Sequence, residues 1–312
     1  MTHALTDAAL RERGLPQPDV ESDKEGRGNV LVVAGSREIP GAALLTATAA
    51  LRAGAGRLTI ATPGCVSMAL GLAVPEARVI ALPETAAGGP APGGIERLVP
   101  LAGRIDALVV GPGLMDEDAT VAFTRALLDR FATTVVLDAY AMGAVTSDTP
   151  GRGNIVLTPH AGEMAHLTGQ PKETIVADAA THARAACDAW RSGVVLKGAT
   201  TWIAFPGEPD WVHRDGDVGL ATSGSGDTLA GLVGGLAARG ALPLDAALWA
   251  VRLHALAGER LAARHGRLGY LARELGDEVP AAMHALCSGA PAGQPGARSG
   301  ASPVAAASSS SA

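Results

Sequence analysis

The chain has 312 residues, of which 47% are hydrophobic and 18% charged, so it can bury a sizeable core and is not disordered as a whole. The formal net charge of −6 and the lack of a basic cluster exclude a protein that binds nucleic acid through its phosphates. A membrane span is excluded too, because the most apolar stretch, Leu229–Ala238, meets Arg239 well short of the roughly 18 uncharged residues needed.

The three cysteines lie far apart, at Cys65, Cys187 and Cys287, and form no Cys-x-x-Cys pair. This spacing argues against a disulfide framework and against a structural zinc site. The N-terminus lacks a basic region followed by an apolar run, so we expect no signal peptide and a cytoplasmic location.

The composition divides the chain into three parts. Residues 1–26 are polar, with no strand pattern before Asn29, and predict an N-terminal arm or an edge helix. Residues 27–287 form the expected single working domain. Residues 288–312 hold Pro, Gly, Ala and Ser with one charge, Arg298, which predicts a disordered low-complexity tail.

Within the working domain, short β-branched runs alternate with helical stretches such as Ala42–Arg52 and Ala119–Phe131. Several runs are continuously apolar, as in strands buried on both faces of a parallel sheet. The expected fold is therefore three-layer α/β, with helices on both faces of the sheet. The expected strands are Val30–Val33, Leu58–Ala61, Val79–Leu82, Ala107–Val110, Val135–Leu137, Ile155–Leu157 and Val194–Leu196.

One margin of the sheet is expected to be antiparallel. Thr201–Phe205 and Asp210–His213 flank the turn sequence Pro206-Gly207-Glu208-Pro209, which predicts a hairpin.

Unusual residues follow several of these strands. Ligands of open α/β sheets bind beyond the carboxyl ends of the strands, so these loops are the places to look for a site. The loops carry Gly35-Ser36 with Pro40-Gly41-Ala42-Ala43, Gly111-Pro112-Gly113, Thr158-Pro159-His160-Ala161-Gly162-Glu163, Lys197-Gly198-Ala199-Thr200-Thr201, and Gly224-Ser225-Gly226-Asp227.

The last of these loops gives the sharpest signal. A glycine-rich turn at a helix N-terminus presents free backbone N–H groups and the positive end of the helix dipole, and so suits an anion such as phosphate. Asp227, on the first turn of that helix, is placed to act as a general base, ionised because the helix end lowers its pKa. The alternative is that Asp227 is only the N-cap of the helix.

Other loop residues allow two interpretations each. Lys197 to Thr201 could meet nucleotide phosphate or ribose, or form an exposed β-turn. His160 could line a ligand site or be structural. Glu163 could hold Mg²⁺ through water or cap a helix, and Asp138 is a candidate for Mg²⁺ or an Asx turn. His254, on an apolar helix, is expected to be a packing residue.

The chain contains neither Gly-x4-Gly-Lys-Ser/Thr nor Gly-x-Gly-x-x-Gly, which excludes a P-loop and leaves a dinucleotide-type Rossmann site unsupported. The five loop motifs, in this order and at these distances, resemble the NAD(P)H-hydrate dehydratase family of ribokinase-like enzymes. The resemblance runs from about Asn29 to about Leu286 and implies a ribokinase-like fold with a mostly parallel sheet.

The resemblance also implies which residues bind ligands. The family's contacts to the hydrated cofactor fall on Ala42, Gly113, His160 and Asp227. Its adenine-nucleotide contacts fall on Lys197, Gly198, Ala199, Thr200, Thr201 and Gly226.

The implied activity is dehydration of the S epimer of hydrated NADH or NADPH, driven by ADP or, as a weaker expectation, by ATP. Phosphorylation of the ring hydroxyl makes it a leaving group, and phosphate departs together with AMP or ADP. Asp227 would remove the hydroxyl proton, while the amides of Gly224, Ser225 and Gly226 stabilise the phosphoryl oxygens. Mg²⁺ would bridge the nucleotide phosphates. A homotetramer is implied as well.

Three departures from the family pattern stand out. The usual Gly-Thr-Gly-Asp is Gly224-Ser225-Gly226-Asp227 here, which keeps the hydroxyl and both glycines. Tyr140 replaces the second acid of the Asp-Ala-Asp-Ala-Leu pattern that begins at Asp138, which weakens a metal site there. The epimerase domain that precedes many family members does not fit in residues 1–28, so a separate epimerase is expected.

Two other functions stay open at this point. A small-molecule kinase of the same fold, of the hydroxyethylthiazole or pyridoxal kinase type, would use the same base but release a phosphorylated product. A non-catalytic adenine-nucleotide-binding module is the second. Asp227 argues against the module, because binding alone needs no carboxylate at that point.

Overall fold

The structure is a computed structural model that describes residues 2–17, 26–149 and 151–289. It contains ten strands, which are β1 (Thr2–Ala4), β2 (Asn29–Val33), β3 (Arg57–Pro63), β4 (Ala77–Leu82), β5 (Ala107–Val110), β6 (Thr134–Leu137), β7 (Ile155–Leu157), β8 (Gly193–Leu196), β9 (Thr201–Ala204) and β10 (Asp210–His213). All seven runs predicted as parallel strands are strands, with ends within two residues of those expected.

The α-helices are α1 (Asp7–Arg13), α2 (Pro40–Arg52), α3 (Gly64–Ala73), α4 (Ile95–Leu98), α5 (Glu117–Leu128), α6 (Ala161–Thr168), α7 (Lys172–Ala177), α8 (Ala179–Trp190), α9 (Ser225–Ala238), α10 (Pro243–His265) and α11 (Ala272–Ser288). Short 3-10 helices lie at η1 (Pro92–Gly94), η2 (Val99–Arg104), η3 (Ala139–Ala144) and η4 (Val218–Leu220).

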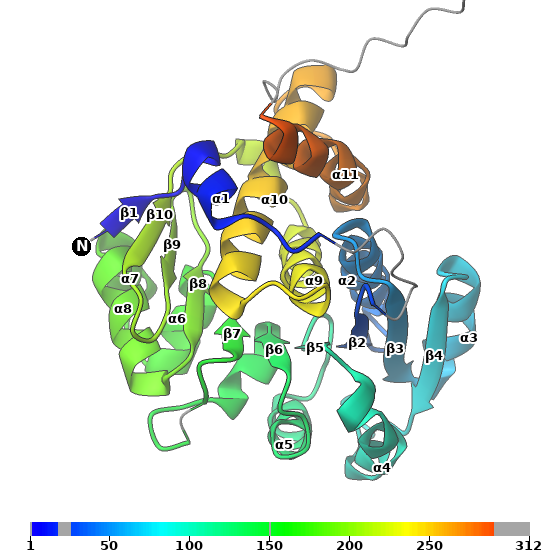
Figure 1. The fold of residues 1–312 in the computed structure, drawn as a ribbon. Helices are drawn as coiled ribbons and strands as arrows, with labels where there is room; N and C mark the ends of the chain where they lie inside the picture. Colours follow the sequence, from blue (N-terminus) through cyan, green and yellow to red (C-terminus); the bar gives the residue numbers. More distant parts are fainter. Residues whose placement is uncertain (1, 18–25, 150, 290–312) are drawn as a thin grey trace, which may run out of the picture.

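The strands form one sheet in the order β1-β10-β9-β8-β7-β6-β5-β2-β3-β4. β9 pairs antiparallel with both of its neighbours, β8 and β10, whereas the other pairs are parallel. The predicted antiparallel hairpin is therefore confirmed, and it lies toward the β1 end of the sheet (Figure 1).

Alternate strand residues enter two separate cores. In β2, Val30 and Val32 pack with residues of α2, α9 and α10, while Leu31 and Val33 pack on the opposite face with residues of α5 and α8. All four side chains are fully buried, as a strand covered on both faces requires. Figure 1 shows the helices on the two sides of the sheet. The predicted three-layer α/β fold is confirmed.

The N-terminal segment contains an element that its sequence did not predict. Thr2–Ala4 form β1, which pairs parallel with β10, so the expectation of no strand before Asn29 is wrong. All three residues of β1 are exposed, which explains why no apolar pattern marks the strand. An edge helix was expected, and α1 follows at Asp7, whose carboxylate accepts a hydrogen bond from Arg252 of α10 at 2.7 Å.

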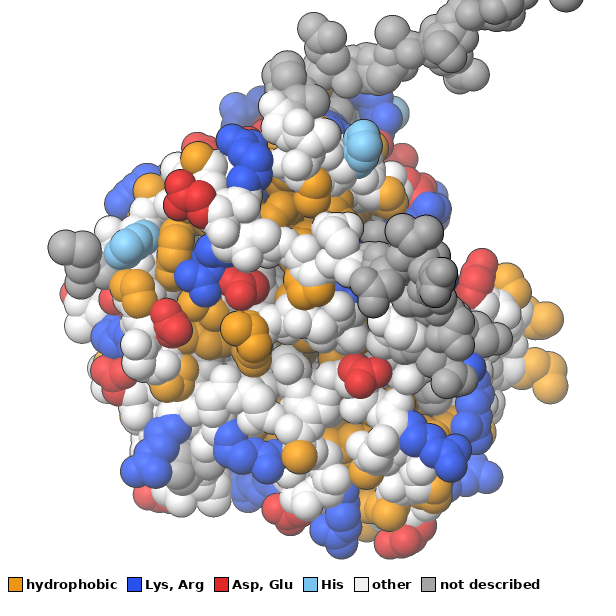
Figure 2. Space-filling view, viewed as in Figure 1, with side chains coloured by type: hydrophobic (Ala, Val, Ile, Leu, Met, Phe, Trp, Pro, Cys, Tyr) orange, Lys and Arg blue, Asp and Glu red, His pale blue; other side chains and the backbone are white. Residues whose placement is uncertain are grey.

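At the other end of the chain, α11 runs to Ser288, the first residue of the predicted tail. The rest of that tail, from residue 290, lies outside the described residues. Within the described part of the chain, no helix combines the length and the apolar character needed to cross a membrane. Acidic and basic side chains are interspersed over the face drawn in Figure 2.

Helices α2 and α9 pack unusually closely. A Cβ atom on Gly231 would collide with the carbonyl oxygen of Thr46, and one on Gly235 would collide with that of Ala50. The two helix backbones are therefore in direct contact. This contact fixes the position of α9 relative to α2. The N-terminal ends of both helices face the carboxyl edge of the sheet.

Candidate active site

The predicted loops meet at one edge of the sheet. The parallel strands β2, β5, β6, β7 and β8 all end there, and the first turn of α9 lies over the same edge. His160 and Lys197 form a parallel bridge just beyond β7 and β8, which holds these two loops side by side.

The glycine turn has the backbone that an anion site needs. Gly224 is the N-cap of α9 with φ of +85°, a left-handed conformation that favours glycine. A side chain here would also collide with Leu45. No side chain caps this helix, so the interpretation of Asp227 as an N-cap is wrong. The backbone N–H of Ser225 donates to the Thr222 carbonyl oxygen at 3.2 Å, which leaves the N–H groups of Gly226 and Asp227 for a ligand.

Asp227 lies on this first turn and is half-buried. Burial, together with the negative charge of Asp138, raises the pKa of Asp227 to about 6, although Lys197 opposes the shift. The expectation that the helix end lowers this pKa is wrong, because loss of solvent and nearby carboxylates outweigh the dipole. A carboxylate with this pKa is well matched to proton transfer near neutral pH.

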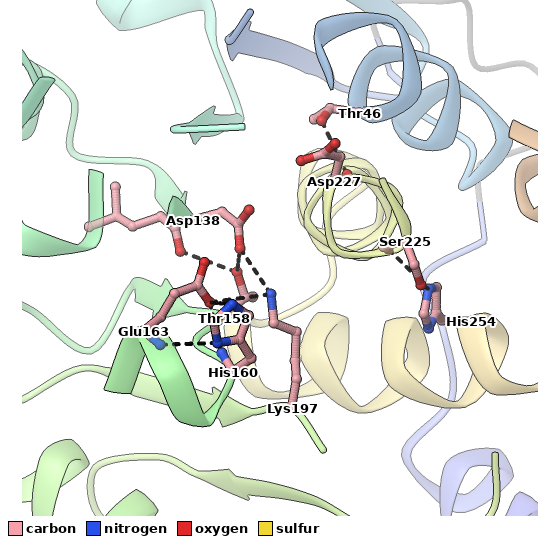
Figure 3. A network of polar contacts seen from close by, with 10 residues as sticks. Thr46, Asp138, Thr158, His160, Glu163, Lys197, Ser225, Asp227 and His254 are labelled. Carbon is pink, nitrogen blue, oxygen red and sulfur yellow. Dashed lines mark hydrogen bonds and ion pairs between the residues drawn. The ribbon is translucent and has the colours of Figure 1, made fainter. Parts of the chain in front are cut away.

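Lys197 links the carboxylates of the site (Figure 3). Its Nζ donates to Asp138 Oδ1 at 3.3 Å and lies 3.8 Å from Glu163 Oε2. Burial works against its charge, but Asp138 and Glu163 outweigh burial and raise the pKa of Lys197. The ammonium therefore stays charged beside the α9 turn, as a phosphate-binding group must.

Asp138 accepts a hydrogen bond from a residue that was not predicted to have a role of its own. The buried Thr158 donates from Oγ1 to Asp138 Oδ1 at 2.6 Å. No local pattern distinguishes Thr158 from the rest of its loop motif. Only the pairing of β6 with β7 places it beside Asp138.

His160 and Glu163 cap α6 reciprocally. Nδ1 of His160 accepts from the Glu163 backbone N–H at 3.0 Å, and the Glu163 carboxylate accepts from the His160 backbone N–H at 2.8 Å. The capping interpretation of Glu163 is thus confirmed. The His160 side chain remains 59% exposed, so its ring can also contact a ligand.

A cavity of about 680 Å³ opens beside Lys197, within the range typical of small-molecule sites. Of the predicted nucleotide-binding residues, Lys197, Gly198, Ala199, Thr201 and Gly226 line it, whereas Thr200 does not. Ser225, His160 and His254 also line it. The structure therefore gathers most of the predicted nucleotide contacts around one cavity.

Two of the predicted substrate contacts, Ala42 and Gly113, meet near the start of α2. Gly113 has φ of +67°, and a Cβ atom there would stand only 2.5 Å from Ala42 Cβ, so these two residues touch. Thr46, one turn after Ala42, donates to the backbone carbonyl of Asp227 at 3.1 Å. Ala42, Gly113 and Asp227 do not line the cavity beside Lys197.

His254 was expected to be a packing residue, but the structure shows a polar contact. Its Nε2 lies 2.9 Å from Ser225 Oγ and 3.1 Å from the Ser225 carbonyl oxygen (Figure 3). The sequence offers no signal for this contact, because 29 residues separate the partners.

The described residues contain no group of three or more His, Cys, Asp or Glu side chains suited to a metal ion. Asp138 Oδ1 and Glu163 Oε2 already accept hydrogen bonds from the protein. A metal site built by the protein alone therefore does not fit. A Mg²⁺ ion carried by nucleotide phosphates would be compatible with these carboxylates, and Asp138 and Glu163 would be the residues to hold it through water.

Comparison with known proteins bears on this site directly. A family model described as NAD(P)H-hydrate dehydratase matches residues 30–281. The ADP-dependent (S)-NAD(P)H-hydrate dehydratase of Xanthomonas campestris pv. campestris is 47% identical over 286 residues, which cover 91% of this chain and 97% of that protein. The chain belongs to the NAD(P)H-hydrate dehydratase family. The family predicted from the five motifs is confirmed.

Solved structures agree with this membership. The ADP/ATP-dependent NAD(P)H-hydrate dehydratase of Bacillus subtilis, co-crystallised with ATP and Mg²⁺, is 32% identical with a TM-score of 0.79, covering 91% of this chain and 98% of that one. A ribokinase-like superfamily protein of Enterococcus faecalis, 25% identical with a TM-score of 0.78, covers 91% of this chain and 96% of its own. The predicted ribokinase-like fold is confirmed.

Some relatives are longer than this chain. The bifunctional NAD(P)H-hydrate repair enzyme of Moorella thermoacetica is 38% identical over 286 residues, and the match covers 90% of this chain but 54% of that protein.

Proposed function

We propose that this chain removes water from the S epimer of hydrated NADH or NADPH and restores the reduced cofactor, with ADP as the phosphoryl donor. The observation that carries the proposal is the position of Asp227 on the first turn of α9, directly after the glycine turn, and its pKa, raised to about 6, agrees with a role as general base. The names of the Xanthomonas and Bacillus relatives support the substrate and the nucleotide.

The nucleotide occupies the cavity beside Lys197 in this proposal. Its terminal phosphate lies against the first turn of α9, where the Gly226 backbone and the Lys197 ammonium lie close together. A Cβ atom on Gly226 would meet only Lys197 Nζ, at 3.1 Å. The space that glycine leaves there is thus available to a phosphate.

The hydrated nicotinamide half lies on the other side of Asp227, against Ala42 and Gly113, with His160 at the edge of both regions. The contact between Ala42 and Gly113 supports this placement. So does Thr46, because it ties Asp227 to the same helix as Ala42.

The reaction follows from this arrangement. Asp227 takes the proton of the ring hydroxyl, and the hydroxyl oxygen attacks the β-phosphorus of ADP. The bond between that phosphorus and the oxygen of AMP breaks, and AMP leaves with the bonding electrons. The turn amides and Lys197 offset the charge on the moving phosphoryl group. The C–O bond then breaks, phosphate leaves, and loss of a ring proton restores the dihydropyridine. Hydrated cofactor and ADP thus give cofactor, AMP and phosphate.

Mg²⁺ bound to the nucleotide would neutralise part of the phosphate charge, and Asp138 and Glu163 are the residues that would hold it through water.

The test is to incubate the protein with hydrated NADH and ADP, ATP or neither, and to follow the reduced-nicotinamide absorbance together with free phosphate. The proposal expects both signals to rise in equal amounts with ADP, and to stay flat without nucleotide. A stable phosphorylated product without recovery of absorbance would favour a small-molecule kinase. Tight ADP binding without any turnover would favour a non-catalytic module.

The protein's assembly and pathway are also proposals. Met68 and Leu72 of α3 are each 80% exposed, and such an apolar face supports the predicted homotetramer. Light scattering of the wild type and of a Met68→Glu/Leu72→Glu variant would test it. The longer relatives are described as bifunctional repair enzymes, which supports a second activity in the same repair pathway. We assign that second activity to a separate epimerase. The cytoplasmic location stays a prediction.

A further inference from the structure

His254 of α10 is a polar side chain in an apolar helix. Its Nε2 contacts both polar oxygens of Ser225, the hydroxyl at 2.9 Å and the carbonyl at 3.1 Å. The neighbouring positions Leu253, Ala255 and Leu256 are buried apolar residues. The His254 ring itself lies at the wall of the cavity beside Lys197. Removing an imidazole from water is unfavourable unless it is hydrogen-bonded, and Ser225 supplies that hydrogen bond.

The ring is neutral at physiological pH, because burial lowers the pKa of His254 to about 4. A neutral imidazole carries one proton, on either Nδ1 or Nε2. A carbonyl oxygen can only accept, so the contact with the Ser225 carbonyl requires that proton to be on Nε2. The N–H then donates to the carbonyl and to Ser225 Oγ together.

This assignment determines what the Ser225 hydroxyl does. If Oγ accepts from His254, its own proton is not used in that contact and can be donated elsewhere. Ser225 and His254 both line the cavity beside Lys197. Ser225 is the first residue of α9, directly after the Gly224 N-cap and before Gly226.

We propose that His254 is a positioning residue that holds the Ser225 hydroxyl as a hydrogen-bond donor toward the phosphate of the bound nucleotide. This inference rests on the proposed function, because it takes the anion at the turn to be that phosphate. It gives the hydroxyl of the glycine turn a defined role, and it gives α10 a part in nucleotide binding.

The test is a double-mutant cycle on ADP affinity, measured by calorimetric titration. Ser225→Ala and His254→Phe should each weaken ADP binding about 10-fold, the size expected for one hydrogen bond to a charged group. The double variant should be no weaker than either single variant, because both remove the same interaction. Effects that multiply in the double variant would overturn the proposal.

Two further variants keep the test independent of folding. His254→Gln retains an N–H donor near the Nε2 position, so it should recover most of the ADP affinity lost in His254→Phe. Ser225→Thr retains the hydroxyl and should bind ADP as the wild type does. Loss of affinity in Ser225→Thr that equals that of Ser225→Ala would contradict a role for the hydroxyl. His265→Phe, at the exposed end of α10, is the control and should change nothing.

The tautomer provides a second measurement. Nitrogen-15 NMR of labelled histidine should show His254 protonated on Nε2 and bare on Nδ1 at neutral pH. A proton on Nδ1 would mean that Ser225 donates to His254, and the proposal would fail.

The ADP-affinity cycle and the NMR measurement are both separate from the dehydration assay. If the wild-type protein binds ADP but does not dehydrate the cofactor, the proposed function is refuted. The double-mutant cycle on ADP affinity would then still test the role of His254. A wild type that does not bind ADP would refute both.

Discussion

Lys197 Nζ stands 3.1 Å from the point where a side chain would begin on Gly226. The space that Gly226 leaves by lacking a side chain therefore lies beside the Lys197 ammonium, at the first turn of α9. A phosphate placed there would meet the backbone amides and the lysine together, so the two residues should affect nucleotide binding in related ways.

Gly226→Val should weaken ADP binding strongly, because the new methyl groups would occupy the phosphate position. Lys197→Ala should cost about 1–3 kcal/mol of binding free energy, the size of a charge-assisted hydrogen bond. Calorimetric titration measures both. Gly103→Val is the matched control, since nothing lies within 4 Å of a Cβ atom there and Gly103 is remote from the site. Unchanged ADP affinity in both site variants would remove this turn from the nucleotide site.

Asp227→Asn should lower kcat by about 10²–10⁴, the usual contribution of a general base, with little change in ADP affinity. The substitution preserves shape, and Gly224 rather than Asp227 is the N-cap, so the fold should persist. Turnover and circular dichroism on the same variant decide the matter. Turnover within a few-fold of the wild type would show that another group is the base.

The raised pKa of Asp227 has two consequences for pH. The free enzyme should lose kcat/KM as the pH falls below about 6, since a protonated carboxyl cannot accept the substrate proton. The folded state also binds this proton more tightly than the unfolded state, whose pKa is near 3.8. The contribution of Asp227 to stability is therefore most favourable below pH 4 and is lost as the pH rises through 6.

Asp227→Asn should consequently melt at a higher temperature than the wild type at pH 8, and the difference should shrink toward pH 4. Thermal unfolding across this range measures it. An equal Tm difference at every pH would show that the carboxyl titrates normally in the folded protein.

His160→Asn should raise KM for the hydrated cofactor while ADP affinity stays near the wild-type value. Asparagine caps helices well, so α6 should keep its N-terminus although the imidazole is lost. His166→Asn provides a matched control on the same helix, because His166 pairs with Glu117 at the surface. Weaker ADP binding with an unchanged KM for the cofactor would mean that His160 belongs to the nucleotide half.

The strands of the central sheet could be predicted because continuous apolar runs such as Ala107–Val110 are buried on both faces. β1 could not, since its three exposed residues gain their structure only by pairing with β10. The order of the strands in the sheet could not be predicted either, because it depends on contacts between segments that are distant in the sequence.

The same limit applies within the site. The residues of the glycine turn and Lys197 were predicted from their motifs, yet the distance between them was not. The pKa of Asp227 was predicted in the wrong direction, because a local argument from the helix end omitted the burial and the Asp138 charge that tertiary structure supplies. The contact between His254 and Ser225 could not be predicted either, because it too depends on tertiary structure.

The backbone contact of α2 with α9 at Gly231 and Gly235 bears on how accurately the site is assembled. No side chain lies between the two helices at these points, so they pack as one rigid body. Ala42 lies on one of these helices and Asp227 on the other, so backbone packing sets the separation between them. A side chain at either glycine would therefore displace Asp227 relative to Ala42 without touching either residue.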